Sequence, residues 1–346
     1  MSHHNCKDTC EYLWDVQAPR FLIVRFSSIG DIILSAPVIH AIREHFGSEA
    51  RIDFVTLRRF KAAAELLPDL NEIHLVEKAT VEVVPALKEL DFNYIIDLHG
   101  NVRSRSLSKS LDVLTFSVDK QTFPRFALIL GLRKSPIPHF IDRSLDLLKV
   151  FGISPPTTST WGSLNTKPLS SASPHLPASY ITIAPGAAHL GKAIPDSTLK
   201  AICLDFSSRN IHIAIVGGPD SQTIASSLIS DLTDNSITSF CGSSSLSETA
   251  HILKNSILAI GGDTGAMHIA SALGIPLISV WGCTRPSLGL SPWRPHPAST
   301  TLLPLRGTRP CSRHGAKCRY TRKGQDLCIN HVSPSRIIEA ATQILN

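Results

Sequence analysis

A run of small and polar residues follows an apolar, strand-like segment in the second half of the chain. Residues 261–268 read GGDTGAMH and precede a segment with helical spacing. Thr264 and Gly265 are therefore expected at a helix N-terminus, where free amides and the helix dipole favour a diphosphate. Asp263 is itself an anion, so its expected partner is a sugar hydroxyl. His268 falls on a similar face of the helix, four residues after Thr264, and a core histidine is the alternative interpretation.

Three more strand-end loops carry groups of this kind. Asp31 in SSIGD begins a helix-like segment, where it is either a functional carboxylate or simply a capping residue. Lys192 in APGAAHLGKAIP either holds its ammonium over a phosphate or lies in solvent. Gly218 and Asp220 in IVGGPDS suit a ribose contact, with ordinary helix capping as the alternative. Because ligands of open α/β sheets bind outside the carboxyl ends of the strands, we expect these loops to gather at one cleft.

Three common nucleotide-binding devices do not occur in the sequence. It contains neither G-x-x-x-x-G-K-[ST] nor G-x-G-x-x-G, which excludes a P-loop and a standard dinucleotide fingerprint. It also has no Asp-x-Asp pair, the usual device for a metal-bridged nucleotide-sugar. We therefore expect no metal ion and no cofactor at the ligand site.

The eight cysteines fall into groups with different expected roles. Cys203, Cys241 and Cys283 lie in apolar segments and are predicted to be small core residues. Four later residues have the spacing C-x6-C-x9-C-x2-H and are of types that bind zinc: Cys311, Cys318, Cys328 and His331. This spacing lacks the closely spaced cysteine pair of common zinc motifs, so we predict no metal site from it and leave the role of the four residues open.

The elements that must position these loops alternate between strand and helix patterns in two series. The expected strands cover residues 21–26, 51–57, 72–76 and 94–100, then 180–187, 212–218, 237–242, 257–263 and 276–282. Helical patterns cover 58–67, 81–90, 102–111 and 139–151 in the first series. Between the two series lies a segment dense in Ser, Thr and Pro, which is typical of a linker.

This pattern predicts an α/β chain of two Rossmann-like domains that face a cleft. A length of 346 residues agrees with about two domains of ordinary size. The predicted units are a tail at 1–19, a first domain at 20–165, a linker at 166–179, a second domain at 180–332 and a closing helix at 333–346.

The net charge of +6 comes entirely from the second half of the chain. Seven of the cations in that half form a run without an intervening acid: Arg306, Arg309, Arg313, Lys317, Arg319, Arg322 and Lys323. This basic run suits an acidic partner such as an anionic lipid, a nucleotide or a nucleic acid, and a solvated loop is the alternative. No apolar run is long enough to span a membrane, and the first residues do not read as a secretory signal, so we expect a cytoplasmic location.

The four loops together resemble those of one family. RFSSIGDIILSAP, APGAAHLGKAIP, IVGGPDS and GGDTGAMHIASALGIPLISVWG are similar in order and spacing to the motifs of glycosyltransferase family 9, the ADP-heptose:lipopolysaccharide heptosyltransferases. The resemblance runs from about residue 20 to the last helix. It implies the two-domain glycosyltransferase B fold, with the acceptor on the first domain and an ADP-sugar on the second. It also implies a lipid-linked acidic glycan as acceptor, peripheral contact with the cytoplasmic face of the inner membrane, and no nucleic-acid partner.

The resemblance implies roles for individual residues. Asp31 matches the general base on the acceptor hydroxyl, and the transfer would invert the anomeric carbon in one displacement. Lys192 matches the lysine on the donor diphosphate, Thr264 and Gly265 match the amides that hold it, and Asp263 matches an acid on the sugar. The negative charge that develops on the leaving ADP would then be stabilised without a metal.

Some positions depart from the family pattern. The lysine loop of the family often ends Lys-Arg-Trp-Pro, whereas residues 192–195 read KAIP. Asp220 stands where the family frequently has glutamate, and His268 matches a histidine whose role stays open. A transferase of the same fold that uses another nucleotide-sugar is therefore one alternative, and a non-catalytic nucleotide- or nucleic-acid-binding protein is another.

The acceptor side is expected to carry basic residues, because the family's acceptors carry carboxylates and phosphates. Arg58, Arg59 and Lys61 begin a helical pattern after one strand, and Arg103 and Arg105 follow the end of another. We predict that these five residues contact the acceptor, with solvated helix faces as the alternative.

Overall fold

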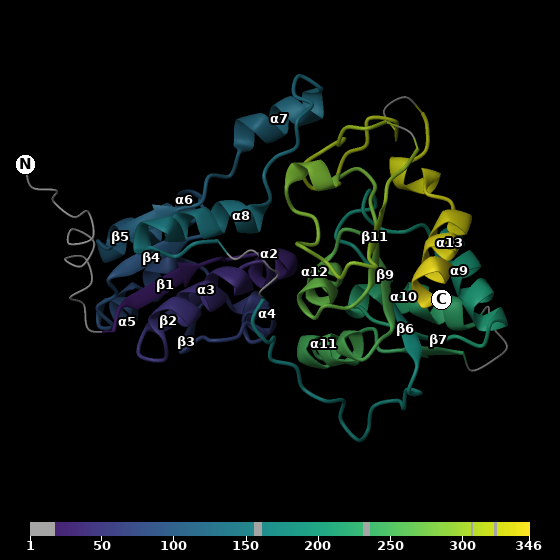
Figure 1. Ribbon diagram of the computed structural model, residues 1–346, viewed down its shortest axis with the longest axis horizontal. Coiled ribbons are helices and arrows are strands. Elements are labelled where there is room, and N and C mark those ends of the chain that lie inside the picture. Colours follow the sequence, from purple (N-terminus) through teal and green to yellow (C-terminus); the bar gives the residue numbers. More distant parts are fainter. Residues whose placement is uncertain (1–17, 156–160, 231–235, 306, 322–323) are drawn as a thin grey trace, which may run out of the picture.

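The computed structural model describes residues 18–155, 161–230, 236–305, 307–321 and 324–346. These residues form two α/β domains that lie side by side, each built around its own parallel sheet (Figure 1). The predicted fold class, two Rossmann-like domains, is therefore confirmed. Within the described residues no helix combines the length and the apolarity needed to cross a bilayer.

The sheet of the first domain has the strand order β3-β2-β1-β4-β5. Its strands are β1 (Arg20–Val24), β2 (Arg51–Leu57), β3 (Glu72–Val76), β4 (Tyr94–Asp97) and β5 (Leu114–Ser117). The central strand β1 is buried after its first residue, as expected of an apolar strand covered on both faces. Val24 pairs with Val55 and with Asp97, so the carboxyl ends of these strands form one edge.

Helices of the first domain connect these strands. They are α2 (Ile29–Ile33), α3 (Ala36–Phe46), α4 (Lys61–Ala64), α5 (Val84–Lys88), α6 (Val102–Leu111), α7 (Thr122–Leu130) and α8 (Phe140–Leu145). Short 3-10 turns cover Arg58–Phe60, Thr80–Glu82 and Asp146–Phe151. Helix α7 projects from the body of the domain (Figure 1).

The sheet of the second domain has the strand order β11-β10-β9-β6-β7-β8. Its strands are β6 (Tyr180–Ala184), β7 (His212–Ile215), β8 (Ile237–Ser239), β9 (Leu258–Gly261), β10 (Leu277–Val280) and β11 (Thr300–Leu302). Its helices are α9 (Asp196–Ser208), α10 (Gln222–Ser230), α11 (Leu246–Lys254), α12 (Gly265–Ala272) and α13 (Pro334–Leu345). 3-10 turns cover Pro219–Ser221, Pro286–Leu288 and Cys328–His331. Ala184 pairs with Gly261, which aligns the ends of the two central strands.

Several elements differ from the sequence prediction. The helix expected at 58–67 is one 3-10 turn followed by the short α4, and Pro68 disfavours helical backbone at the residue before it. Strands β5 and β11 were not predicted, because both are short strands at sheet edges with mixed burial. Helix α7 was not predicted either.

The connection between the domains is attached to both. Trp161 is buried and its ring packs edge-on against Trp293 of the second domain at 5.6 Å between centroids. The Asn165 amide N–H donates to the carbonyl of Leu66 in the first domain at 2.9 Å. The C-terminal helix α13 packs against α9 of the second domain.

Candidate active site

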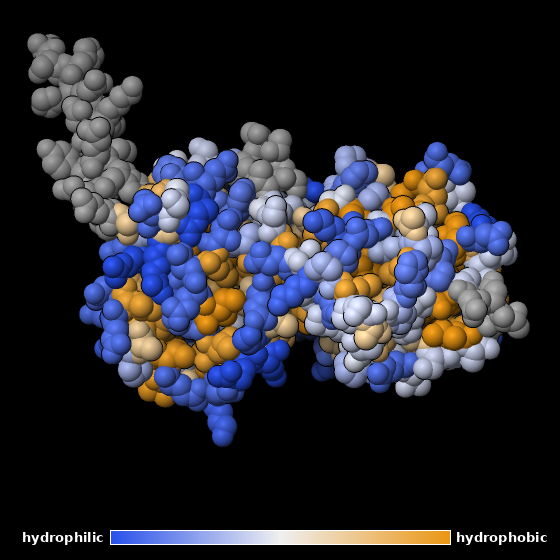
Figure 2. All heavy atoms as spheres, turned by 90° about the horizontal axis from the view of Figure 1, so that it is seen from below, coloured by the Kyte–Doolittle hydropathy of each residue, from blue (hydrophilic) through white to orange (hydrophobic). Residues whose placement is uncertain are grey.

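A cleft of about 830 Å³ lies between the carboxyl ends of the two sheets. Residues that follow β1, β4 and β5 line one side, and residues that follow β6, β7, β9 and β10 line the other. Seen from below, the molecular surface narrows where the two lobes meet (Figure 2). This is the place that parallel α/β sheets offer to a ligand.

Asp31 lies in the first turn of α2, on the first-domain side of the cleft. Its Oδ2 accepts hydrogen bonds from the Ser28 amide at 3.2 Å and the Ser28 hydroxyl at 3.0 Å, and it pairs with Nη2 of Arg25 at 2.9 Å. Burial raises the pKa of Asp31, but the charge of Arg25 and these hydrogen bonds lower it further, to about 2. Asp31 is therefore an anion at every physiological pH.

Arg25 is fixed independently of Asp31. Its Nε donates to the Ser27 carbonyl at 2.9 Å, its Nη1 donates to the Leu98 carbonyl, and its guanidinium stacks over the Phe140 ring at 4.9 Å from the centroid. The side chain is buried. A guanidinium held from three sides positions the carboxylate it faces, so the geometry of Asp31 is set before any ligand arrives.

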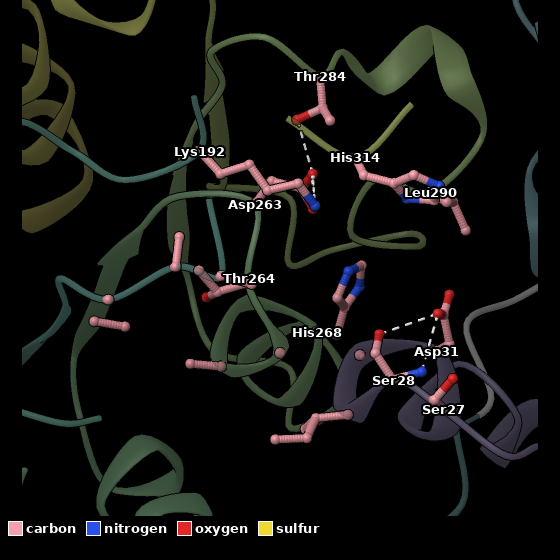
Figure 3. Close-up of a pocket in the computed structure, with 18 of the residues that line it drawn as sticks. Ser27, Ser28, Asp31, Lys192, Asp263, Thr264, His268, Thr284, Leu290 and His314 are labelled. Carbon is pink, nitrogen blue, oxygen red and sulfur yellow. Dashed lines mark hydrogen bonds and ion pairs between the residues drawn. The ribbon is translucent and has the colours of Figure 1, made fainter. Parts of the chain in front are cut away.

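On the opposite side of the cleft, Lys192 pairs with Asp263. The Lys192 Nζ lies 2.7 Å from Oδ2 of Asp263, and the same oxygen accepts a hydrogen bond from the Thr284 hydroxyl at 2.8 Å (Figure 3). The two charged side chains are only 19% and 11% exposed. The structure thus joins the loops that follow β6, β9 and β10.

The Lys192 loop is held by close backbone packing. A Cβ on Gly262 would lie 2.0 Å from the Lys192 carbonyl oxygen, so no larger residue fits there. Gly315 has a φ of +82° and abuts the Lys192 side chain, where a Cβ would lie 2.7 Å from Cγ. Gly262 therefore serves the packing of the lysine loop, whereas Gly261 lies against Met267 and the Ala184 carbonyl. The N-terminus of α12 stays open to the cleft.

Helix α12 starts at the cleft and meets α2 of the other domain. Thr264 is its N-cap and Gly265 its first residue, and a Cβ on Gly265 would lie 2.7 Å from a methyl carbon of Ile29. His268, one turn further on, lies against Gly30, where a Cβ would approach the imidazole Cδ2 to 2.6 Å. The two glycine loops that the sequence placed in separate domains are in direct contact.

Two buried polar atoms at the start of α12 have no hydrogen-bond partner among the described residues: Oγ1 of Thr264 and Nδ1 of His268. Burial lowers the pKa of His268, so its imidazole is neutral at pH 7. The ring lies between the Asp31 cluster and the Lys192–Asp263 pair (Figure 3). Unpaired buried polar atoms are costly, and a ligand with hydroxyl or phosphate oxygens would satisfy them.

Gly218 and Asp220 also line the cleft, at the turn after β7. Gly218 caps the 3-10 turn Pro219–Ser221, and the Asp220 side chain is exposed. The buried Ser221 hydroxyl lies close to Gly186 and Gly217, where a Cβ would approach it to 2.2 and 2.7 Å. All seven residues predicted for the donor side therefore lie around one cleft.

The five cations predicted for the acceptor side do not line this cleft. Arg58 pairs with Glu77, and Lys61 pairs with Glu65. Arg59 lies over the Phe60 ring and Arg103 over the Phe26 ring. All five side chains are exposed, Arg105 on α6 included.

A different group of cations surrounds the Asp31 side of the cleft: Arg25, Lys120, Arg125, Arg143 and Arg313. Burial lowers the pKa of Arg125 to about 10, with further lowering by Arg143 and Arg313. Burial, with Arg25, also lowers the pKa of Lys120. Nε of Arg125 and Nη2 of Arg143 are buried without a partner among the described residues. Cations that repel one another at the edge of a cleft form a site for an anion.

The sequence carries a signal for this group of cations beside Asp31. Arg125 is the only charged residue in the apolar segment TFPRFALIL of α7, and Lys120 lies three residues after the end of β5. Neither feature points to a site without α7 and β5, and the sequence pattern predicts neither element.

Some residues of the basic run contact α7, and others line the cleft. Arg309 donates to the Leu130 carbonyl and Arg319 to the Ile129 carbonyl, both at the C-terminal end of α7. Cations are favourable there because of the helix dipole. Arg313 and its neighbour His314 line the cleft. Arg306, Arg322 and Lys323 lie outside the described residues.

The structure confirms the predicted role of two cysteines and contradicts that of a third. Cys203 and Cys241 are buried as predicted, but Cys283 lies in a cluster with Cys311, Cys318 and Cys328 instead of among aliphatic core residues. His331, which the spacing grouped with the three late cysteines, is not part of this cluster.

Comparison with known proteins gives the family of the chain. The model of glycosyltransferase family 9 (heptosyltransferase) matches residues 81–315, about two thirds of the chain. Lipopolysaccharide heptosyltransferase 3 of Escherichia coli K12 is 21% identical over 293 residues, which cover 77% of this chain and 82% of the relative.

Solved structures share the fold. A family 9 glycosyltransferase from Veillonella parvula superposes with a TM-score of 0.76 at 17% identity, covering 96% of this chain and 98% of that one. The E. coli heptosyltransferase WaaC with ADP-2-deoxy-2-fluoro heptose superposes with a TM-score of 0.67 at 18% identity, covering 94% and 99%. The fold is that of the glycosyltransferase B enzymes, and the chain belongs to glycosyltransferase family 9, the heptosyltransferase family.

Proposed function

We propose that the protein transfers a heptose from ADP-heptose onto an acidic inner-core acceptor of lipopolysaccharide, with inversion at the anomeric carbon. The observation that carries the proposal is the contact between α2 and α12, which places the Asp31 carboxylate and the start of α12 at one cleft. Relatives described as lipopolysaccharide heptosyltransferases, and a solved relative with an ADP-heptose analogue, support the choice of substrates.

On the donor side, the diphosphate of the ADP-sugar would lie at the N-terminus of α12. The amides after Thr264 and the hydroxyl of Thr264 would donate to its oxygens, and Lys192 would add a positive charge. Asp263, which now pairs with Lys192, would orient that ammonium and reach a sugar hydroxyl. The ribose would lie toward Gly218 and Asp220, and Nδ1 of His268 would meet the sugar or the diphosphate.

The chemical step would be a single displacement. The acceptor oxygen would form a bond to the anomeric carbon as the bond from that carbon to the diphosphate oxygen breaks, and the hydroxyl proton would pass to Asp31. Charge that develops on the leaving ADP would be stabilised by Lys192 and the α12 amides, which supply the electrostatic help that a metal ion gives in other transferases.

The low pKa of Asp31 affects how it would act. A carboxylate with a pKa near 2 is a weak base toward a free hydroxyl, since general bases work best near the operating pH. The hydroxyl becomes strongly acidic only as its oxygen bonds to the anomeric carbon, so the proton would move late in the displacement. Arg25 would then keep the carboxylate aimed and ionised.

The acceptor would lie on the first-domain side, with its acidic groups among Lys120, Arg125 and Arg143. These cations lack carboxylate partners among the described ion pairs and lie beside Asp31, so they suit the carboxylates and phosphates of an acidic sugar. The exposed cations Arg58, Arg59, Lys61, Arg103 and Arg105 would contact only parts of the acceptor that extend beyond the cleft.

Peripheral membrane contact at the cytoplasmic face would come from α7 and the residues that follow it. Four large apolar side chains are exposed there, with Lys134 beside them: Phe123, Phe126, Leu130 and Leu132, between 49% and 87% exposed. An apolar surface next to a cation suits an anionic bilayer. Cosedimentation with vesicles that contain phosphatidylglycerol tests this, since a Phe123→Ser/Phe126→Ser variant should lose binding, whereas Val102→Ser, an exposed apolar residue on α6, should keep it.

The function itself is tested by transfer. Purified protein, ADP-heptose and Kdo-bearing lipid A, or its heptosylated form, should give a product heavier by one heptose in mass spectrometry, without added divalent metal ion. UDP- and GDP-sugars serve as controls for the nucleotide. Binding of ADP-heptose without transfer would mean a different acceptor, and neither binding nor transfer would contradict the proposal.

A further inference from the structure

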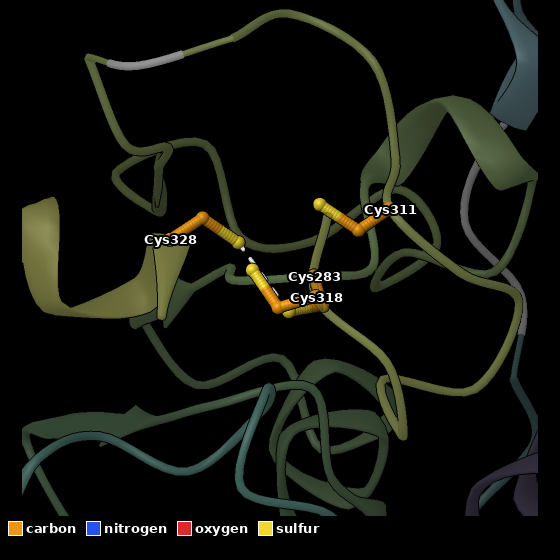
Figure 4. A group of neighbouring side chains, drawn as sticks. All are labelled: Cys283, Cys311, Cys318 and Cys328. Carbon is orange, nitrogen blue, oxygen red and sulfur yellow. Dashed lines mark hydrogen bonds between the residues drawn. The ribbon is translucent and has the colours of Figure 1, made fainter. Parts of the chain in front are cut away.

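Four cysteine side chains meet in the second domain, away from the cleft lining. The sulfur atoms of Cys283, Cys311, Cys318 and Cys328 all lie within 4.8 Å of one another (Figure 4). Cys283 comes from the loop after β10, Cys311 and Cys318 from the long segment after β11, and Cys328 from the 3-10 turn before α13. Three of the four residues are buried, and the fourth, Cys311, is partly buried.

This geometry matches a single metal centre. A tetrahedral centre with metal–sulfur bonds of about 2.3 Å places its sulfurs about 3.8 Å apart. Sγ of Cys283 and Sγ of Cys328 lie 3.4 Å apart, and no two of the four sulfur atoms are more than 4.8 Å apart. The donor set holds four thiols and neither carboxylate nor imidazole, which selects soft, tetrahedral metals over magnesium or calcium.

The charge of Arg285 supplies an independent argument for a metal ion at the four cysteines. Arg285, two residues after Cys283, is only 2% exposed, and among the described residues its guanidinium donates to the carbonyls of Thr284 and Gly307 but has no carboxylate partner. Its Nε is buried without a partner among them. A buried cation needs a counter-charge, and four thiolates around a divalent ion carry a net charge of −2.

Backbone hydrogen bonds hold the loops that carry Cys283 and Cys311 in place around the cysteine cluster. The Cys311 amide donates to the Cys283 carbonyl at 2.7 Å, and the Cys283 amide donates to the Gly191 carbonyl at 2.7 Å. A Cβ on Gly191 would lie 2.6 Å from Sγ of Cys283, so this loop passes directly beside the cluster. Such outer contacts orient ligands in structural metal sites.

We propose that Cys283, Cys311, Cys318 and Cys328 bind one structural metal ion, of the class of Zn²⁺ or Fe²⁺, through four thiolates. The ion ties the long segment after β11 to the end of β10. Metal binding of this kind contributes directly to folding, since the ligands are far apart in the unfolded chain.

The ion also positions part of the donor side, an extension that rests on the proposed function. Residues 313–315 lie between two of the ligands, and they place Arg313 and His314 on the cleft and Gly315 against the Lys192 side chain. Thr284, the residue after Cys283, holds Asp263. The four cysteines are therefore positioning residues for Lys192 and Asp263 and touch no substrate.

Elemental analysis of the purified full chain tests the site directly. After dialysis against metal-free buffer we expect one zinc or iron per chain, and the element found distinguishes the two metals. Cys283→Ser should lose that equivalent, whereas Cys241→Ser, a buried cysteine outside the cluster, and His331→Ala, which the sequence spacing grouped with the late cysteines, should keep it. Retention of the metal by Cys283→Ser together with its loss in His331→Ala would overturn the proposed ligand set.

A second measurement does not depend on a variant that folds. Wild-type protein unfolded with a chelator and refolded with Co²⁺ should show the visible d–d bands of a tetrahedral site and intense thiolate-to-cobalt charge-transfer absorption. Purified protein without metal, with its cluster cysteines either as free thiols or in disulfides by peptide mass spectrometry, would overturn the proposal. Both readouts are independent of transferase activity, so a failure of the proposed function leaves them unaffected.

Discussion

The imidazole of His268 packs against the backbone of Gly30, across the boundary between the two domains. A Cβ at position 30 would approach Cδ2 of His268 to 2.6 Å, and both residues are buried. Gly30 immediately precedes Asp31, and His268 lies one turn into α12. The contact therefore sets the distance between the proposed base and the proposed diphosphate site.

Replacing Gly30 by Ala should increase the distance between Asp31 and the N-terminus of α12. Overpacking of this kind costs about 1–3 kcal/mol, and here the strain falls on the domain contact. We expect a loss of transfer activity much larger than the change in melting temperature. The double variant Gly30→Ala/His268→Ala, which removes the imidazole, should regain part of the domain contact, measured by small-angle scattering. Full activity of Gly30→Ala would show that the contact between Gly30 and His268 does not determine the geometry of the site.

Arg25 should control the ionisation of Asp31. The carboxylate form is present above its pKa and is lost as the pH falls through it, and Arg25 is the main influence that brings this pKa down to about 2. In Arg25→Gln burial remains without that charge, so the pKa should rise. The acid limb of kcat/KM, and the NMR titration of the Asp31 carboxyl carbon, should move to higher pH. Arg105→Gln on α6 should leave both unchanged, and an unmoved titration in Arg25→Gln would refute this role.

Lys192 should act on the diphosphate. Lys192→Ala removes a charge where the leaving group would become anionic, so kcat should fall by about 10²–10³, in line with the loss of one preorganised electrostatic donor. ADP binding should weaken as well, measured by calorimetry. Lys200→Ala on the exposed face of α9 is the matched control. Equal ADP affinity and kcat in Lys192→Ala and wild type would place the diphosphate elsewhere.

Arg125 should contribute to the binding of the acceptor and not to that of the donor. Hydrogen bonds to charged groups contribute about 1.5–3 kcal/mol, so Arg125→Gln should raise the KM for an acidic acceptor by about tenfold or more. The KM for ADP-heptose should not change. Arg58→Gln, at a surface ion pair, should have a small effect on either. A rise in the donor KM alone would assign Arg125 to the other substrate.

The gathering of the candidate donor residues at one cleft could be predicted from the sequence, because these residues follow strand ends. Lys192, Asp263 and Thr264 lie in loops with glycines after apolar strands, and parallel strands bring such loops to one edge. Their mutual pairing could not be predicted, since the ion pair of Lys192 with Asp263 depends on how two loops pack around Gly262.

The first-domain cations and the cysteine cluster show the opposite case. Arg125 lies on α7 and Lys120 in the loop before it, and this helix was not predicted. Arg143 lies within the helix predicted at 139–151, but only the three-dimensional arrangement brings the three cations to Asp31. Cys283 is far from the other cysteines in sequence and sits after an apolar strand, which favoured a core role. Spacing alone therefore selected His331 in its place, although the fold brings Cys283 to the cluster.

The central claim is that Asp31 takes the acceptor proton beside a donor held at α12. The most direct test is heptose transfer by Asp31→Asn, followed by mass spectrometry, with ADP-heptose binding measured by calorimetry on the same sample. General-base help typically contributes about 10²–10⁴-fold, so we predict a loss of that size in turnover with donor affinity retained. Wild-type turnover by Asp31→Asn would contradict the account.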